Sequence, residues 1–81
     1  MVKILYFAAL REIVTLDEEA LELPEQVRTV REFVTHLQLI RPALRGKMAS
    51  VRVALDEAFA ADSDTLKGVQ TIALIPPVAG G

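Results

Sequence analysis

The 81-residue sequence has no cysteine, which excludes disulfides and any thiolate that could act as a nucleophile or a soft metal ligand. It has one histidine, His36, which lies near the apolar stripe of a predicted helix, where a packing role is expected. Ser50 and Ser63 lack the Gly-x-Ser-x-Gly setting of a nucleophile elbow, and there is no glycine-rich phosphate loop. We therefore expect no conventional catalytic side chain.

An excess of one charge is also lacking. Nine basic and eleven acidic residues are interspersed, and the net charge of −2 argues against a nucleic-acid partner. No apolar run approaches the roughly 18 residues of a membrane span, and the apolar start is too short for a signal peptide. Asp62-Ser63-Asp64 lacks the later ligands of a calcium loop, so no metal is expected. Asp17-Glu18-Glu19 is interpreted as a solvated strand edge. These features predict a cytoplasmic protein.

Hydrophobic periodicity predicts a mixture of strands and helices. The clearest helix begins at Thr29, which forms a capping-box pattern with Glu32, and ends at Arg41 before a proline. The last strand is almost entirely apolar, which predicts a central position that is covered on both faces and parallel to the first strand. Strands are expected at 2–7, 17–23, 51–55, 58–60 and 71–75, with a short helix at 8–14 and connecting structure at 42–47. This order predicts an α+β, β-grasp (ubiquitin-like) domain over 1–75, in which a mixed sheet clasps one main helix.

The final six residues, Pro76-Pro77-Val78-Ala79-Gly80-Gly81, follow the last predicted strand. Consecutive prolines cannot pair inside a sheet, so we expect a flexible, extended tail over 76–81. Six extended residues reach about 20 Å from the domain. Because Gly80 and Gly81 have no side chain, they can enter a channel too narrow for a Cβ. The carboxylate of Gly81 could then be condensed with AMP, and a sulfur donor could convert the mixed anhydride to a thiocarboxylate.

If the tail is functional, the free energy needed to order it must come from burying surface on the rest of the domain. Ordering six flexible residues costs about 6–12 kcal/mol, at about 1–2 kcal/mol each, and Pro76 and Pro77 reduce this cost by restricting the free chain. The remainder must be offset by apolar burial, at about 25 cal/mol per Å². We therefore predict an exposed apolar patch near the root of the tail. The alternative interpretation is a disordered end or a cut linker.

Two motifs together resemble a known family. Phe7-Ala8-Ala9-Leu10-Arg11-Glu12 after the first strand and Pro-Pro-Val-Ala-Gly-Gly at the end are similar to the small subunit of molybdopterin synthase, the MoaD family. The resemblance covers the whole chain, in length, element order and both motifs. Thiamine-pathway sulfur carriers share the fold and the Gly-Gly end, but they are typically shorter and lack both motifs.

The resemblance implies a role in molybdenum cofactor biosynthesis. Gly81 would be adenylated by an ATP-dependent, E1-like enzyme, as a transient acyl-AMP, and then thiocarboxylated with a sulfur donor. The tail would insert into the large synthase subunit, in an assembly of two small and two large subunits. There the thiocarboxylate sulfur would build the dithiolene of molybdopterin from precursor Z. Catalytic side chains would belong to the partner, and this chain would bind no cofactor itself.

The resemblance also implies an interface. Phe7, Phe59 and Ile75 match apolar interface positions of the family, and Arg11 matches a polar contact. The alternative interpretations are core packing for Phe59 and Ile75 and a solvated helix charge for Arg11.

The sequence departs from the family pattern in two turns. Lys67-Gly68-Val69-Gln70 replaces the usual Gly-Asp, and Asp56 replaces the usual asparagine at the hairpin tip. Two other functions stay open: a ubiquitin-like modifier that forms isopeptide bonds through Gly81, and a β-grasp interaction module with an inert tail.

Overall fold

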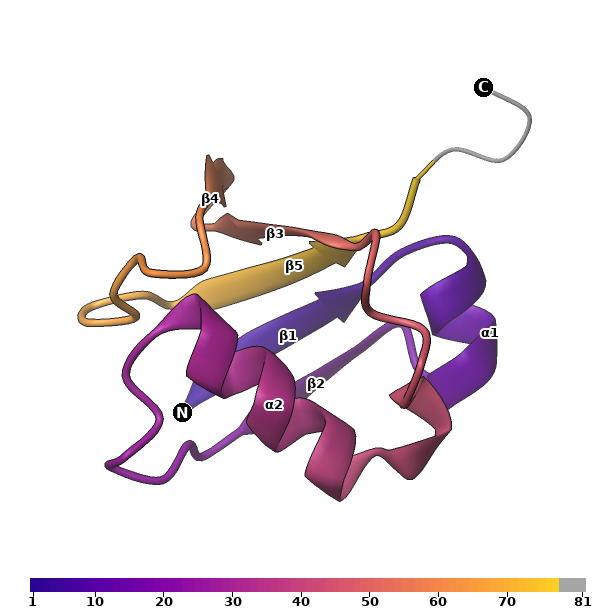
Figure 1. Ribbon diagram of the computed structural model, residues 1–81, viewed down its shortest axis with the longest axis horizontal. Coiled ribbons are helices and arrows are strands. Elements are labelled where there is room, and N and C mark those ends of the chain that lie inside the picture. Colours follow the sequence, from indigo (N-terminus) through magenta and orange to yellow (C-terminus); the bar gives the residue numbers. More distant parts are fainter. Residues whose placement is uncertain (78–81) are drawn as a thin grey trace.

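The order of the helices and strands follows the sequence-based prediction closely (Figure 1). The structure is a computed structural model that describes residues 1–77, so Val78, Ala79, Gly80 and Gly81 of the predicted tail lie outside the described residues. The elements are β1 (Val2–Tyr6), α1 (Ala9–Val14), β2 (Glu18–Leu21), α2 (Val30–Ile40), the 3-10 helix η1 (Pro42–Leu44), β3 (Arg52–Leu55), β4 (Ala58–Ala60) and β5 (Thr71–Ile75).

The five strands form one mixed sheet in the order β2-β1-β5-β3-β4. β5 occupies the centre and runs parallel to β1, with Ile4 opposite Ile72 and Tyr6 opposite Leu74. The other pairings, β1 with β2, β3 with β5 and β3 with β4, are antiparallel. This topology confirms the predicted β-grasp fold, with its last strand beside its first.

The main helix, α2, begins at the predicted capping box. The Thr29 hydroxyl accepts a hydrogen bond from the N–H of Glu32 at 3.2 Å, and the Glu32 carboxylate accepts one from the N–H of Thr29 at 3.1 Å. These reciprocal bonds satisfy N–H groups that a helix start leaves without partners. The helix ends at Ile40, and the N–H of the capping residue Arg41 still donates to the carbonyl of Leu37.

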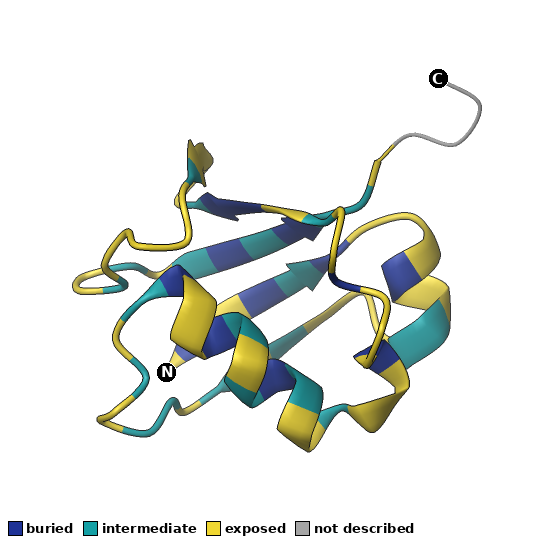
Figure 2. Ribbon diagram, viewed as in Figure 1, coloured by how far each residue is buried: buried dark blue, intermediate teal, exposed yellow. Residues whose placement is uncertain are grey.

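One hydrophobic core lies between the sheet and the helices. The buried face of α2 carries Val30, Phe33 and Leu37, which recur at helical spacing and meet the sheet (Figure 2). Strands β1, β3 and β5 alternate along their length and turn every second side chain into this core. The buried core cluster consists of Val2, Ile4, Tyr6, Leu10, Val30, Phe33, Leu37, Leu44, Met48, Val53, Ile72 and Leu74.

The prediction that β5 is covered on both faces is wrong. Ile72 and Leu74 are fully buried, whereas Thr71, Ala73 and Ile75 on the opposite face are only half-buried. The helices pack on one face of the sheet, and no described residue outside the sheet belongs to a layer over the other. The apolar sequence of β5 therefore reflects its central position in the sheet, although one of its faces is open.

The interpretation of residues 17–19 as a solvated edge is also wrong for Glu19. Its side chain is only 12% exposed and accepts hydrogen bonds from the Tyr6 hydroxyl and from Arg41, which also forms an ion pair with it. Asp17 and Glu18 are exposed, as expected. Strand alternation explains the difference, because Glu18 and Glu19 point to opposite faces of the sheet.

Candidate functional site

The predicted tail begins where the central strand ends. Ile75 closes β5, Pro76 is half-buried, Pro77 is exposed, and neither proline belongs to a strand. Since β1 and β5 are parallel, their carboxyl ends meet at the same edge of the sheet (Figure 1). Residues from the end of β1 therefore lie beside the root of the tail.

Phe7 is the residue that follows β1 at this edge. Its N–H donates to the carbonyl of Leu74 at 3.3 Å, which continues the β1–β5 ladder and places it next to Ile75. The Phe7 side chain is 45% exposed, an unusual position for an aromatic ring with an adjacent core. Ala8 then turns the chain into α1 with a positive φ of 51°.

Phe59 reaches the same face from the far side of the sheet. It lies on β4 opposite Ala54, which pairs with Ala73 of β5, and Ala73 pairs in turn with Leu5 of β1. Phe59 as a residue is 58% exposed. The alternation of strands places these side chains on the open face of the sheet. We call this surface the outer apolar face; it comprises Leu5, Phe7, Phe59, Ala73 and Ile75.

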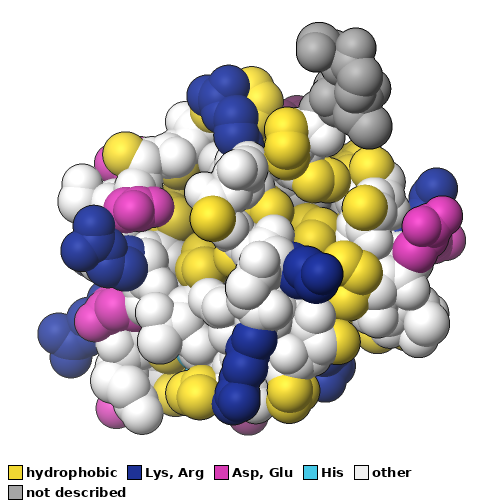
Figure 3. All heavy atoms as spheres, turned by 45° about the vertical axis from the view of Figure 1, so that its right-hand side comes forward, with side chains coloured by type: hydrophobic (Ala, Val, Ile, Leu, Met, Phe, Trp, Pro, Cys, Tyr) yellow, Lys and Arg dark blue, Asp and Glu magenta, His cyan; other side chains and the backbone are white. Residues whose placement is uncertain are grey.

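Three of the four predicted interface residues thus share one surface. Phe7, Phe59 and Ile75 belong to the outer apolar face, so core packing does not account for the two exposed rings. Arg11 lies on α1, two residues beyond its start, and its exposed side chain forms an ion pair with Asp17 at 3.6 Å. Figure 3 shows hydrophobic side chains gathered on the end of the molecule that carries α1 and the carboxyl end of β5, with basic side chains among them.

Sequence analysis missed one residue of this surface, Arg52. It pairs with Ile75 across β3 and β5, and its guanidinium carbon lies 3.9 Å from the centre of the Phe59 ring. The signal was present in the alternation of Val51, Val53 and Leu55, which directs Arg52 to the opposite face. Recognising its neighbours required the pairing of β3 with β5.

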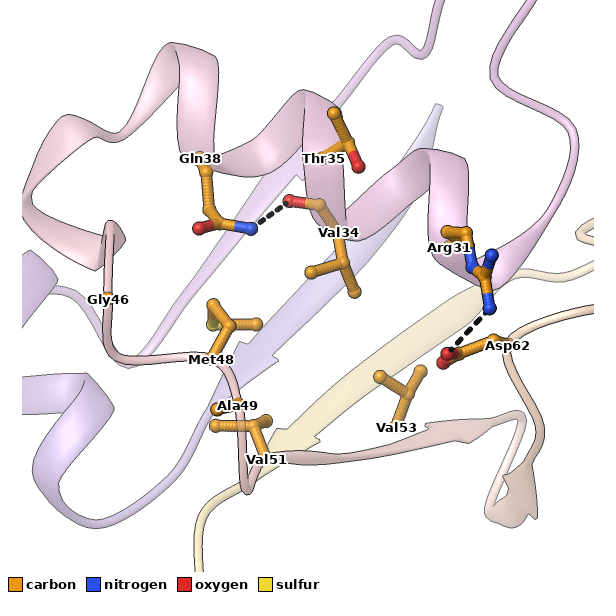
Figure 4. Close-up of a pocket in the computed structure, with 10 residues that line it drawn as sticks. All are labelled: Arg31, Val34, Thr35, Gln38, Gly46, Met48, Ala49, Val51, Val53 and Asp62. Carbon is orange, nitrogen blue, oxygen red and sulfur yellow. Dashed lines mark hydrogen bonds and ion pairs between the residues drawn. The ribbon is translucent and has the colours of Figure 1, made fainter.

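A separate hollow of about 430 Å³ lies between α2 and the chain leading into β3 (Figure 4). Arg31 and Asp62 form an ion pair of 3.5 Å at one end, and the Gln38 amide donates to the carbonyl of Val34 at 3.2 Å. None of the predicted interface residues lines it. The lining residues are Arg31, Val34, Thr35, Gln38, Gly46, Met48, Ala49, Val51, Val53 and Asp62.

The acidic loop that resembles half of a calcium site has other roles. Asp62 pairs with Arg31, and the carboxylate of Asp64 accepts a hydrogen bond from the N–H of Ala61 at 2.9 Å. Within residues 1–77, no group of three or more acidic, histidine or cysteine side chains is arranged to hold a metal ion. His36 is half-buried on α2. In the same part of the chain, no helix is both long and apolar enough to cross a membrane.

Solved structures share this fold along almost the whole chain. SAMP1 from Haloferax volcanii is 23% identical, with a TM-score of 0.83, and the match covers 99% of this chain and 98% of that one. The putative molybdopterin converting factor, subunit 1, from Pyrococcus furiosus is 27% identical with a TM-score of 0.80, over 95% and 97% of the two chains.

The sequence itself is similar to two relatives along almost the whole of this chain. The molybdopterin synthase sulfur carrier subunit of Chlamydomonas reinhardtii is 32% identical over 99% of this chain and 98% of that protein. The subunit of the same name from Arabidopsis thaliana is 31% identical over 99% of this chain and 82% of that protein. The family model of the ThiS family matches residues 4–81. The chain therefore belongs to the ThiS family and, within it, to the MoaD-type ubiquitin-like sulfur carriers.

Proposed function

We propose that this chain is the sulfur-carrying small subunit of molybdopterin synthase and that the carboxylate of Gly81 is its reactive group. The observation that carries the proposal is the outer apolar face at the root of the Gly-Gly segment. Two exposed aromatic rings, Phe7 and Phe59, flank the strand from which that segment departs. An exposed apolar patch beside a functional terminus is a surface suited to a protein partner.

The chemistry proceeds in steps that partner proteins catalyse. The Gly81 carboxylate attacks the α-phosphate of ATP in an E1-like enzyme, forms acyl-AMP and releases pyrophosphate. Hydrosulfide supplied by a sulfur donor then attacks the carbonyl carbon and displaces AMP, which leaves a thiocarboxylate. In the large synthase subunit, this sulfur attacks a carbon of precursor Z and displaces an oxygen substituent there. Hydrolysis of the resulting thioester leaves the sulfur on the pterin and returns Gly81 to a carboxylate. Because a dithiolene holds two sulfur atoms, two thiocarboxylated chains must each deliver one.

Docking on the outer apolar face offsets the entropy cost of ordering the tail. Ordering the residues from Pro76 to Gly81 costs about 6–12 kcal/mol before any contact is made. Burying a few hundred Å² of apolar surface at about 25 cal/mol per Å² offsets much of that cost. Phe7, Phe59 and Ile75 provide such surface at the correct edge of the sheet. Catalytic side chains, including any that contact the pterin, would then be those of the large subunit.

Intact-mass measurement tests the proposal directly. The protein is incubated with an E1-like activating enzyme, ATP and a sulfur source. Replacement of one oxygen by one sulfur at Gly81 supports the sulfur carrier. A ladder of lysine conjugates would instead identify a ubiquitin-like modifier, and an unchanged mass would identify an interaction module with an inert terminus.

A chain extension tests the role of the terminus. Adding one alanine after Gly81 removes the carboxylate from its position and should abolish thiocarboxylation and dithiolene formation. Because the added residue lies beyond the sheet, the urea midpoint of unfolding should not change. The matched control adds one alanine before Met1. Dithiolene formation by the C-terminally extended protein at the wild-type rate would disprove the mechanism.

A further inference from the structure

Arg52 occupies an unusual position on the outer apolar face. Its backbone pairs with Ile75, the last residue of β5, and its guanidinium carbon lies 3.9 Å from the centre of the Phe59 ring. At this distance the cation is attracted to the face of the Phe59 ring. A guanidinium carries its N–H groups in a fork whose geometry matches a carboxylate.

Most other arginines of this chain have a polar partner. Arg11, Arg31 and Arg41 form ion pairs with Asp17, Asp62 and Glu19 respectively. Arg28 donates through its Nε to the carbonyl of Glu25 at 3.3 Å. Among the residues that the structure describes, the Arg52 guanidinium takes part in no ion pair and no hydrogen bond.

A partner that covers Ile75 and Phe59 must also cover Arg52, because the three side chains are neighbours on one face. Removing a guanidinium from water without a counter-charge is strongly unfavourable. The large subunit must therefore present an acidic group here, or the Arg52 guanidinium must stay hydrated at the edge of the interface. The cation–π contact with Phe59 favours the first arrangement, because it restrains the cation before docking and reduces the entropy lost on pairing.

We propose that Arg52, restrained by its contact with Phe59, is a specificity-determining residue. It forms an ion pair with a carboxylate that lies within an apolar surface of the large synthase subunit. This inference rests on the proposed function and adds the chemistry of the partner's surface. It predicts that the pair forms only when the outer apolar face is covered, since a surface-exposed pair would contribute little. Arg52 thereby helps to select the correct partner through its charge as well as its shape.

The test measures the affinity of the full-length protein for the large subunit from the same source, by calorimetry at several salt concentrations. Arg52→Gln should weaken binding by about tenfold or more, and Arg52→Glu should weaken it further. Arg52→Lys should recover only part of the affinity, because an ammonium cannot form the planar, two-pronged contact. Arg28→Gln, the same charge change on the segment before α2, is the control and should bind as the wild type does.

The outcomes separate this inference from the proposed function. Wild-type affinity in both Arg52→Gln and Arg52→Glu would overturn the inference while leaving thiocarboxylation of Gly81 intact. A defect confined to adenylation, with unchanged affinity for the large subunit, would also overturn it. If the wild-type protein neither binds the large subunit nor accepts sulfur, the proposed function itself fails. Circular dichroism of each variant establishes that the fold is retained.

Discussion

Glu19 connects three elements of the fold through its side chain. Its carboxylate accepts a hydrogen bond from the Tyr6 hydroxyl at 2.5 Å and from the Nε of Arg41 at 3.1 Å. These side chains join β1, β2 and the end of α2. Burial alone would raise the pKa of Glu19, but the hydrogen bond and charge of Arg41 and the hydrogen bond of Tyr6 outweigh it, and the pKa is lowered. Burial and the hydrogen bond to Glu19 raise the pKa of Tyr6.

The lowered pKa of Glu19 predicts an acid-sensitive component of stability. A carboxyl group whose pKa is lower in the folded state stabilises the fold above its unfolded pKa, near 4.5, and this contribution disappears as the pH falls through the folded pKa. The difference in stability between wild type and Glu19→Gln, measured by urea denaturation, should therefore shrink progressively as the pH falls below about 4.5. The control, Glu18→Gln on the exposed face of β2, should follow the wild type. A constant difference between wild type and Glu19→Gln down to pH 2 would contradict the assignment.

At the scale of secondary structure, the β3–β4 hairpin also organises the start of β5. Asp56 and Glu57 both have positive φ, at 47° and 75°, as a two-residue type I′ turn requires. The Asp56 carboxylate accepts hydrogen bonds from the N–H groups of Gln70 at 3.1 Å and Thr71 at 2.9 Å. The departure from asparagine at this position therefore keeps an oxygen acceptor where the last strand begins.

Removing that acceptor should destabilise the protein. Asp56→Ala leaves two N–H groups without their side-chain partner, and we expect a loss of about 1–2 kcal/mol in the free energy of unfolding. Asp56→Asn retains a carbonyl oxygen and tolerates positive φ, so its loss should be smaller. Chemical denaturation of both variants measures the difference. Equal losses in the two would show that the negative charge of Asp56, and not the oxygen acceptor, determines the effect.

Local patterns predicted the elements better than they predicted their surroundings. The spacing of Val30, Phe33 and Leu37, with a capping box at Thr29, is a local signal, and α2 forms where it indicates. The open face of β5 could not be predicted, because an all-apolar strand gives no alternation to mark it. The role of Glu19 depends on Arg41, which is distant in sequence, and no local pattern shows that pairing.

The same reasoning applies to the candidate site. Phe7, Phe59 and Ile75 entered through the family resemblance, and the strand register then placed them on one surface. Arg52 was missed because its role depends on two neighbours from other strands, Ile75 and Phe59. A pattern in one strand indicates which face a side chain occupies, but the neighbours on that face come from the topology of the whole sheet.

At the scale of the whole molecule, the two faces of the sheet have separate tasks. One face packs against α2 and holds the domain together, and the other carries exposed apolar residues such as Phe7 and Phe59. Figure 2 shows buried segments on the side of the sheet that faces α2. In the proposed function the open apolar surface is covered by the large subunit, since large exposed apolar patches mark interaction sites or favour aggregation. Substitution of a buried phenylalanine should therefore lower stability, whereas substitution of an exposed one should impair sulfur delivery.

Two phenylalanine-to-alanine variants test this separation. Phe33 is fully buried on α2, so Phe33→Ala should lower the free energy of unfolding by about 3–5 kcal/mol. Phe59 is 58% exposed, so Phe59→Ala should cost less than about 1 kcal/mol but should reduce binding to the large subunit and the rate of dithiolene formation. Urea denaturation and a synthase assay with pre-thiocarboxylated protein measure the two effects independently.

If Phe59→Ala unfolds as easily as Phe33→Ala, the ring is a structural element and the outer apolar face is not a docking surface. If Phe59→Ala instead keeps both stability and the wild-type rate, the partner must contact the domain elsewhere, since only an unused surface would tolerate the loss of an exposed aromatic ring from the outer apolar face.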